Sequence, residues 1–220
     1  MIILCVSDQI DPQIYTSTIK QSYSDVDIVL SAGDLPADYL DFITNTLRKP
    51  LFFVHGNHHT DNRPKEAHSV NRKVCCNAGL IVAGLGGSRQ MAKRISSQMG
   101  IQSGAAPVPS FKGVNQYSDL QMTIAMLKLA PMLLFNRIFR RRFLDILLTH
   151  APVQGIHDAK GKDARGFKCF LLFLKIFKPK YLVHGHIHYY DPGEDRTTQL
   201  GNTLIINAYG HYLIDTGENT

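Results

Sequence analysis

The 220-residue sequence predicts a layered α/β fold in one domain, residues 1–220. Short apolar runs typical of buried strands alternate with longer helical or loop segments, which is the pattern of an α/β protein. A hydrophobic content of 44% is enough to bury a substantial core. The length fits one large domain better than two small ones.

Buried strands are predicted at the apolar runs 2–6, 27–30, 51–54, 80–83, 145–148 and 181–183. The last part of the chain differs, because its runs 197–200, 203–208 and 211–214 are short and are separated by Gly201-Asn202 and by Gly210. These three runs predict antiparallel hairpins, the first of them closed by a tight turn.

Helices are predicted at 12–21, 36–47, 117–142 and 167–177. The third is the longest and contains Pro131, which should kink it or split it in two. It is apolar over much of its length and basic at its end, which suits core packing with a favourable cationic C-terminus or, as the alternative, a membrane surface. Gly, Ser, Gln and Pro are frequent at about 87–116, which predicts a long mobile loop that acts as a functional lid.

Charge and cysteine content indicate which partners and which cellular compartment to expect. Twelve of the 24 Lys and Arg residues fall between 128 and 180 against three acids, so this region should attract anions such as phosphorylated substrates. Nucleic acid is possible on charge alone, but no aromatic residues are interleaved for base stacking. The four cysteines show no Cys-x-x-Cys spacing, and the sequence has no signal peptide and no run of roughly 18 apolar residues. We therefore expect a cytoplasmic protein with reduced thiols and no transmembrane segment.

Polar residues that can ligate metals follow nearly every predicted strand. They are Asp8, Asp34, Asn57 with His58, His150, and His186 with His188. Because α/β folds place their sites at the carboxyl ends of strands, these side chains should converge on one edge. Oxygen and imidazole ligands without thiolates suit manganese, iron(II) or zinc. Two divalent metal ions are the simplest inference for such a set.

Three glycines directly precede predicted ligands. They are Gly33 before Asp34, Gly56 before Asn57, and Gly185 before His186. A ligand at a sharp turn from strand to loop requires a neighbour without a Cβ, so that metal or phosphate can approach the backbone. Each signal is weak alone, but their order along the chain is specific.

That ordered series, Gly33-Asp34, Gly56-Asn57-His58, Thr149-His150 and Gly185-His186-Ile187-His188, resembles the motifs of the calcineurin-like metallophosphoesterase superfamily. The resemblance spans Asp8 to His188 and implies two mixed β-sheets packed face to face and flanked by helices. It implies that Asp8 and His188 hold the first metal, that Asp34 bridges, and that Asn57, His150 and His186 hold the second. It also implies that His58 is catalytic and assists the leaving group.

Two positions depart from the family pattern. The family usually has Asp-x-His where this chain has Asp8-Gln9-Ile10, and isoleucine cannot ligate a metal. Asp11, Gln9 or water replaces the missing ligand, or the first site is weak or empty; alternatively, Asp11-Pro12 is only a helix cap. At His59 the family commonly has an acid, so the pKa and orientation of His58 are open.

Two further segments have open interpretations. The run Gly84-Leu85-Gly86-Gly87-Ser88 could bind an oxyanion through backbone amides or form a plain turn. His157-Asp158 could bind substrate or lie in an exposed loop. His55, His68, His184 and His211 are predicted to be structural, with His55 and His184 placed to support motif residues.

The function implied by these residues and by the resemblance is hydrolysis of a phosphomonoester or phosphodiester by a metal-activated hydroxide. The substrate would be a phosphorylated small molecule or a nucleotide. Ile10 supports an alternative, a scaffold or regulatory binding protein that kept the fold and lost efficient catalysis. The joint presence of Asp34, Asn57 and His150 with the other motif residues argues against that alternative.

Overall fold

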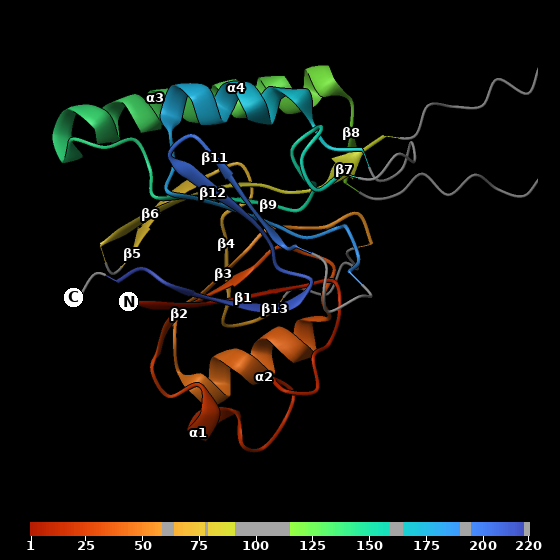
Figure 1. Cartoon of the computed structure of the whole chain (residues 1–220). Helices are drawn as coiled ribbons and strands as arrows, with labels where there is room; N and C mark the ends of the chain where they lie inside the picture. Colours follow the sequence, from red (N-terminus) through yellow and green to blue (C-terminus); the bar gives the residue numbers. More distant parts are fainter. Residues whose placement is uncertain (59–63, 78, 91–114, 159–164, 190–194, 218–220) are drawn as a thin grey trace, which may run out of the picture.

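The computed structural model describes residues 1–58, 64–77, 79–90, 115–158, 165–189 and 195–217. Two mixed β-sheets lie face to face between a lower layer of helices, α1 (Ile19–Ser22) and α2 (Ala37–Leu47), and an upper layer, α3 (Asp119–Arg140) and α4 (Lys168–Phe177) (Figure 1). The predicted fold class is confirmed. The greater part of the loop predicted at about 87–116 lies outside the described residues, as does His59.

The first sheet has the strand order β13-β1-β2-β3-β4. Its strands are β1 (Ile2–Ser7), β2 (Val26–Ser31), β3 (Leu51–Phe53), β4 (His68–Ser69) and β13 (Gly210–Asp215). Strands β1 to β4 pair in parallel, and β13 is antiparallel to β1. The carboxyl ends of β1, β2 and β3 therefore lie at one edge of the sheet.

The second sheet has the order β11-β12-β10-β9-β6-β5. Its strands are β5 (Val74–Asn77), β6 (Leu80–Leu85), β9 (Ile146–Thr149), β10 (Tyr181–His184), β11 (Thr197–Leu200) and β12 (Thr203–Asn207). The four inner strands are parallel, and the two outer strands are antiparallel to their neighbours. A small parallel pair, β7 (Ser88–Arg89) and β8 (Gln116–Tyr117), stands apart.

Strand β1 shows why its sheet is buried on both faces. Ile3 and Cys5 belong to the core between the two sheets, whereas Leu4 and Val6 belong to the core between the first sheet and helices α1 and α2. Successive side chains of a strand point to opposite faces, so a continuous apolar run is required where both faces are covered. A third core lies between the second sheet and the α3–α4 layer.

Helix α3 begins at a capping box. The Ser118 side chain accepts a hydrogen bond from the Gln121 amide, and the Gln121 side chain accepts one from the Ser118 amide. The helix then runs through Pro131 as one element, so of the two predicted alternatives, a kink or a split, the split does not occur. Proline removes the hydrogen bond to the carbonyl of Leu127, and both residues lie on the exposed side, where water can bind that carbonyl.

Two predicted elements differ in the structure. The helix predicted at 12–21 is reduced to α1, because the amides of Ile14 and Tyr15 bond to the Asp11 carbonyl in a turn and the following Thr16-Ser17-Thr18 has low helix propensity. The run 211–214 does not form a hairpin with β12. It belongs to β13, which pairs with β1 in the other sheet.

The prediction of no transmembrane segment requires a qualification. Helix α3 is long and apolar enough to cross a membrane by length and composition alone, and 33% of its most apolar window is buried inside the protein. The core helix of a globular protein satisfies the same test. The buried residues of α3 pack in the core above the second sheet.

Candidate metal centre

The carboxyl ends of parallel strands from both sheets meet at one edge of the molecule. Asp8 follows β1, Asp34 and Asn57 follow β2 and β3, and His150 and His186 follow β9 and β10. Hydrogen bonds join the two sheets here: the His186 amide donates to Asp8 Oδ2 (2.9 Å), and His150 Nδ1 lies 2.8 Å from the Ala32 carbonyl. The first of these bonds joins residues that are 178 positions apart in the chain, so the cluster is a product of the fold.

The most compact part of this cluster is formed by Asp34, Asn57 and His150. His150 Nε2 lies 3.1 Å from Asp34 Oδ2 and 3.0 Å from Asn57 Oδ1. The His150 side chain is fully buried, and that of Asp34 is 7% exposed. Asp8, Asp34 and His150 each offer a ligand atom, and these atoms all lie within 4.8 Å of one another.

The tautomer of His150 follows from its contacts. The Ala32 carbonyl can only accept, so Nδ1 carries a proton and donates to it. Nε2 then points its lone pair at two further lone-pair atoms, Asp34 Oδ2 and Asn57 Oδ1. Nε2 and the two oxygens cannot all face one another with lone pairs, so a proton on Nε2 or on Asp34, or a cation, lies among them. An imidazole whose other nitrogen donates to a carbonyl is the usual form of a metal-binding histidine.

The charges of the site favour the ionised forms of both Asp34 and His150. Burial acts to raise the pKa of Asp34, but the hydrogen bond and charge of His150, together with the His58 amide, hold it below its usual value. Burial likewise acts to lower the pKa of His150, but the hydrogen bond to Asp34 and the charge of Asp8 raise it. The two carboxylates therefore create a negative potential that favours a cation.

The part of the site at His188 is more open, although the Asp8 side chain itself is buried. Asp8 Oδ2 accepts hydrogen bonds from Ser7 Oγ (2.6 Å) and from the His186 amide, which fix the carboxylate. His188 Nε2 lies 4.0 Å from Asp8 Oδ1, and the His188 side chain is 46% exposed. The His188 ring stacks on Tyr209, and the His186 ring lies 5.0 Å from that of His150. All six predicted ligands thus lie along one edge, with different degrees of burial.

Three of these residues adopt a backbone conformation that is uncommon outside glycine. Asp8, Asp34 and His186 have φ values of 63°, 56° and 67°. Such left-handed residues cost free energy and are concentrated at functional sites. In each case the conformation turns the chain sharply where the strand ends, which brings the side chain into the cluster.

Two of the glycines are explained by close approach to these carboxylates. A Cβ on Gly56 would collide with the Asp34 carboxylate, and a Cβ on Gly185 would collide with Ser7 Oγ and Asp8 Oδ2. Any larger residue at either position would displace a predicted ligand. The sequence signal, a glycine directly before three of the six predicted ligands, therefore has a steric origin at these two positions that only the folded chain displays.

The first departure from the family pattern lies at the open side of the site. Ile10 is 41% exposed and offers no ligand atom. The Asp11 carboxylate has other partners: Oδ2 lies 2.7 Å from His211 Nδ1, and Oδ1 accepts a hydrogen bond of 2.8 Å from the Gln13 amide. His211 Nε2 lies in turn 3.2 Å from the Tyr23 hydroxyl. Asp11 thus ties the loop after β1 to β13.

His58, the predicted catalytic residue, is held by its backbone. Its amide donates to Asp34 Oδ1 at 2.9 Å, and the residue is exposed. An exposed imidazole anchored beside the Asp34 carboxylate has room to reach a leaving group. The neighbouring His59 lies outside the described residues, so its influence on His58 stays a prediction.

A chain of hydrogen bonds lies behind the His186–His188 loop and joins His184, which is expected to support motif residues, to His157, whose role the sequence does not indicate. His184 Nδ1 donates to the Gly185 carbonyl (2.9 Å), so His184 Nε2 accepts from His157 Nδ1 (3.0 Å), and His157 Nε2 accepts from the Thr198 hydroxyl (2.9 Å). Burial lowers the pKa of His184 to about 3, which keeps both rings neutral as this pattern requires. Both ring nitrogens of His157 are thus engaged within the protein, which favours a supporting role over substrate binding.

The glycine-rich segment does not form an anion cradle. The amides of Gly86, Gly87 and Ser88 donate to Asn71 Oδ1, the His55 carbonyl and the Asn115 carbonyl. With these donors used internally, the segment is a packed turn. The oxyanion alternative is therefore wrong for these three amides.

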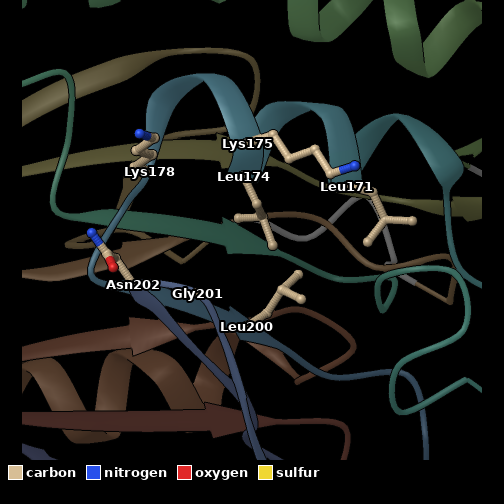
Figure 2. A pocket seen from close by; sticks show the side chains of 7 residues that line it. All are labelled: Leu171, Leu174, Lys175, Lys178, Leu200, Gly201 and Asn202. Carbon is tan, nitrogen blue, oxygen red and sulfur yellow. The ribbon is translucent and has the colours of Figure 1, made fainter.

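A sizeable cavity of about 590 Å³ lies elsewhere, between α4 and the β11–β12 hairpin (Figure 2). Its lining consists of Leu171, Leu174, Lys175, Lys178, Leu200, Gly201 and Asn202. None of these residues belongs to the cluster described above. This cavity is therefore not the mouth of the candidate metal centre.

Comparison with protein families decides what kind of fold carries this cluster. The model of the calcineurin-like phosphoesterase family matches residues 3–190, which include every residue of the cluster. The chain belongs to the calcineurin-like phosphoesterase family. No curated protein sequence matches it.

Solved structures agree at the level of the fold. TT1561 of Thermus thermophilus is 14% identical, with a TM-score of 0.58 over 95% of this chain and 89% of that chain. The phosphopantetheinyl hydrolase PptH of Mycobacterium tuberculosis is 12% identical, with a TM-score of 0.52 over 94% and 88% of the two chains. At these identities the likeness extends to the fold alone. The calcineurin-like phosphoesterase family binds divalent metals, and the arrangement of Asp34, Asn57 and His150 fits a cation.

Proposed function

We propose that this chain hydrolyses a phosphomonoester or phosphodiester with the help of two divalent cations. The observation that carries the proposal is the convergence of three lone pairs, from Asp34, Asn57 and His150, at 3.0–3.1 Å in a buried position. Such an arrangement is stable with a cation among the three atoms. Family membership supports phosphoester hydrolysis as the reaction class.

The roles of the residues follow from their positions. Asn57, His150 and His186 would hold one cation, Asp8 and His188 the other, and Asp34 would lie between both. When bound, two such cations would supply Lewis acidity and a nucleophile at neutral pH. The backbone amides of His58 and His186 orient Asp34 and Asp8, so both carboxylates are fixed before substrate arrives.

His58 would serve the leaving group. Its amide is anchored on Asp34, while its exposed side chain can protonate or hydrogen-bond the departing oxygen. The substrate is proposed to be a phosphorylated small molecule or a nucleotide, and the positive charge of the chain favours the approach of such anions. Manganese, iron(II) and zinc are the candidate metals because all ligands are oxygen or imidazole nitrogen.

The test combines metal analysis with a hydrolysis screen. Purified protein is loaded separately with manganese, zinc, iron(II) or magnesium, and generic monoesters and diesters are assayed with each. Two equivalents of bound metal and metal-dependent release of product are expected. Tight metal binding without hydrolysis of any ester would favour the scaffold alternative, for which Ile10 is the supporting feature.

A further inference from the structure

The outer surface of α3 is apolar over nearly its whole length. Its exposed residues include Leu120, Ile124, Leu127, Pro131, Met132, Leu134, Phe135, Ile138 and Phe139. Ile138 is 72% exposed and Leu120 is 69% exposed, so most of each side chain faces outward. A helix that is apolar on all sides is normally covered on all sides.

Helical geometry places several of these residues on one line. With 3.6 residues per turn, Leu120, Leu127, Pro131 and Ile138 lie opposite the buried residues that pack in the core, such as Leu129. The helix that carries this line has 22 residues, or roughly 33 Å at 1.5 Å per residue. Monomeric soluble proteins rarely expose a continuous apolar surface of that extent without using it.

Helix α4 extends this surface. Leu171 and Lys178 line the cavity on the β11 side of α4, as Figure 2 shows, whereas Leu172 and Ile176 are not among the residues that line it. Leu172 and Ile176 are 49% and 48% exposed. Because α3 lies next to α4 on the same side of the second sheet (Figure 1), the exposed apolar residues of both helices belong to one outer layer.

Apart from Asp119, the first residue of α3, which forms an ion pair with Arg89, the charged residues of α3 and α4 are all basic. Residues 120–144 contain no Asp or Glu, and the same is true of α4. Lys128 and Arg140 of α3 and Lys168 and Lys175 of α4 are exposed. Long cationic side chains can lay their stems along apolar surface while the charged groups reach outward. We name the exposed apolar and basic residues of α3 and α4 together the α3–α4 face.

We propose that the α3–α4 face docks on an anionic lipid bilayer, with α3 lying in the plane of the headgroups. An apolar helix face bordered by Lys and Arg is the signature of interfacial helices, and anionic headgroups would pair with these cationic side chains. A second copy of the chain fits less well, because pairing this face with itself would oppose cations of like charge. Residues 91–114 also contain basic residues and no acid, so they offer no neutralising charge.

The experiment measures co-sedimentation of the full chain with vesicles of phosphatidylcholine alone or mixed with phosphatidylglycerol. We expect binding to the mixed vesicles and much weaker binding to the neutral ones. Lys128→Gln with Lys168→Gln should weaken binding to mixed vesicles about 25-fold, at about fivefold for each charge near the surface. Lys128 lies on α3 and Lys168 on α4, and neither helix carries a residue of the candidate metal centre, so metal content should not change.

The apolar part is tested by Leu127→Gln, Phe135→Gln and Ile138→Gln combined, which should abolish binding to both vesicle types. Leu213→Gln on β13 is the matched control, because Leu213 is 45% exposed and lies in the other sheet; it should bind as the parent does. All four positions are exposed, and a thermal melt verifies that each variant is folded. If the triple variant fails to fold, the binding of the two-charge variant and of the parent protein to the two vesicle types still tests the proposal.

Three outcomes would overturn the proposal. They are a parent protein that fails to bind mixed vesicles, a parent protein that binds neutral vesicles equally well, and a triple variant that binds like the parent. A parent dimer in sedimentation equilibrium that becomes monomeric in the triple variant would assign the face to a second copy. Failure of the hydrolysis screen would leave this result unaffected, since docking does not require catalysis.

Discussion

The two sides of the candidate metal centre differ in how closely the fold brings their ligands together and in how deeply it buries them. On one side, His150 is fully buried and lies 3.0–3.1 Å from Asn57 and Asp34. On the other, His188 is 46% exposed and lies 4.0 Å from Asp8, and Ile10 offers no ligand. The buried side holds its ligands together through core packing, whereas the open side depends on a loop. From this difference we expect the two sides to have unequal affinities for metal.

The largest effect is expected from Asp34→Asn, which acts on both sides. Asp34 contacts His150 directly and lies in one cluster with Asp8, and the amide side chain lacks the charge that neutralises cations. Both metal equivalents and hydrolysis should be lost together, as measured by metal analysis after desalting and by ester hydrolysis. Retention of two equivalents by this variant would mean that Asp34 does not bridge the sites.

His58→Ala separates chemistry from metal binding. The bond from His58 to Asp34 is made by the backbone amide, and alanine keeps that amide. Metal content should stay near that of the parent while the rate falls roughly 10²–10⁴-fold, the range for lost general acid–base assistance. Loss of a full metal equivalent would instead make the imidazole a ligand.

Much of this arrangement could be predicted from the sequence. The strand positions follow from short apolar runs, and the ligand positions follow because Asp34, Asn57 and His150 closely succeed such runs. Those signals are local, since burial on both faces requires uninterrupted apolar residues. The family pattern then supplies the order of the ligands.

Features that depend on contacts between distant segments could not be predicted. The partners of Asp11 and of His184 come from β13 and from the loop at His157, and nothing near either residue in the sequence indicates them. Likewise, β13 pairs with β1 and not with β12, because pairing partners are chosen by the whole core. The exposure of the α3–α4 face could also be recognised only in the structure, because a fully buried helix has the same composition.

Gly185→Ala tests whether the open side depends on its loop. The added Cβ would collide with Ser7 Oγ and Asp8 Oδ2, so the loop carrying His186 and His188 must shift. We expect the weaker metal equivalent to be lost and hydrolysis to fall with it, while the tighter equivalent is weakened less. Calorimetric titration with manganese resolves the two steps.

Gly155→Ala is the control for this variant. Gly155 has a φ of 83°, and a Cβ there would meet nothing within 4 Å. The substitution should reduce stability by about 1 kcal/mol through backbone strain and leave both metal-binding steps unchanged. Equal losses of metal in the two variants would show that general destabilisation, and not the collision at Gly185, explains the effect.

Ile10→His should make the two sides more alike. Histidine at this position would supply the ligand that the family usually has, and Ile10 is exposed enough to be replaced without disturbing the core. In the parent protein we expect two unequal steps in the metal titration, with hydrolysis appearing as the weaker site fills. In the variant the weak step should tighten and the strong step should hardly change. Two equally tight steps in the parent would refute this account of the open side.

The smallest effect is expected from Asp11→Ala, which asks whether this carboxylate replaces the missing ligand. Its Oδ2 is engaged with His211 and its Oδ1 with the Gln13 amide, so the variant should lose about 0.5–2 kcal/mol of unfolding free energy, as when a capping side chain is removed. Both metal-binding steps should persist. Asp11→Asn is the matched control, since it keeps an acceptor for the Gln13 amide and should recover part of the stability in urea unfolding. If Asp11→Ala removes the weak step while Asp11→Asn only weakens it, Asp11 leaves His211 to bind the cation, and the open side completes its own ligand set.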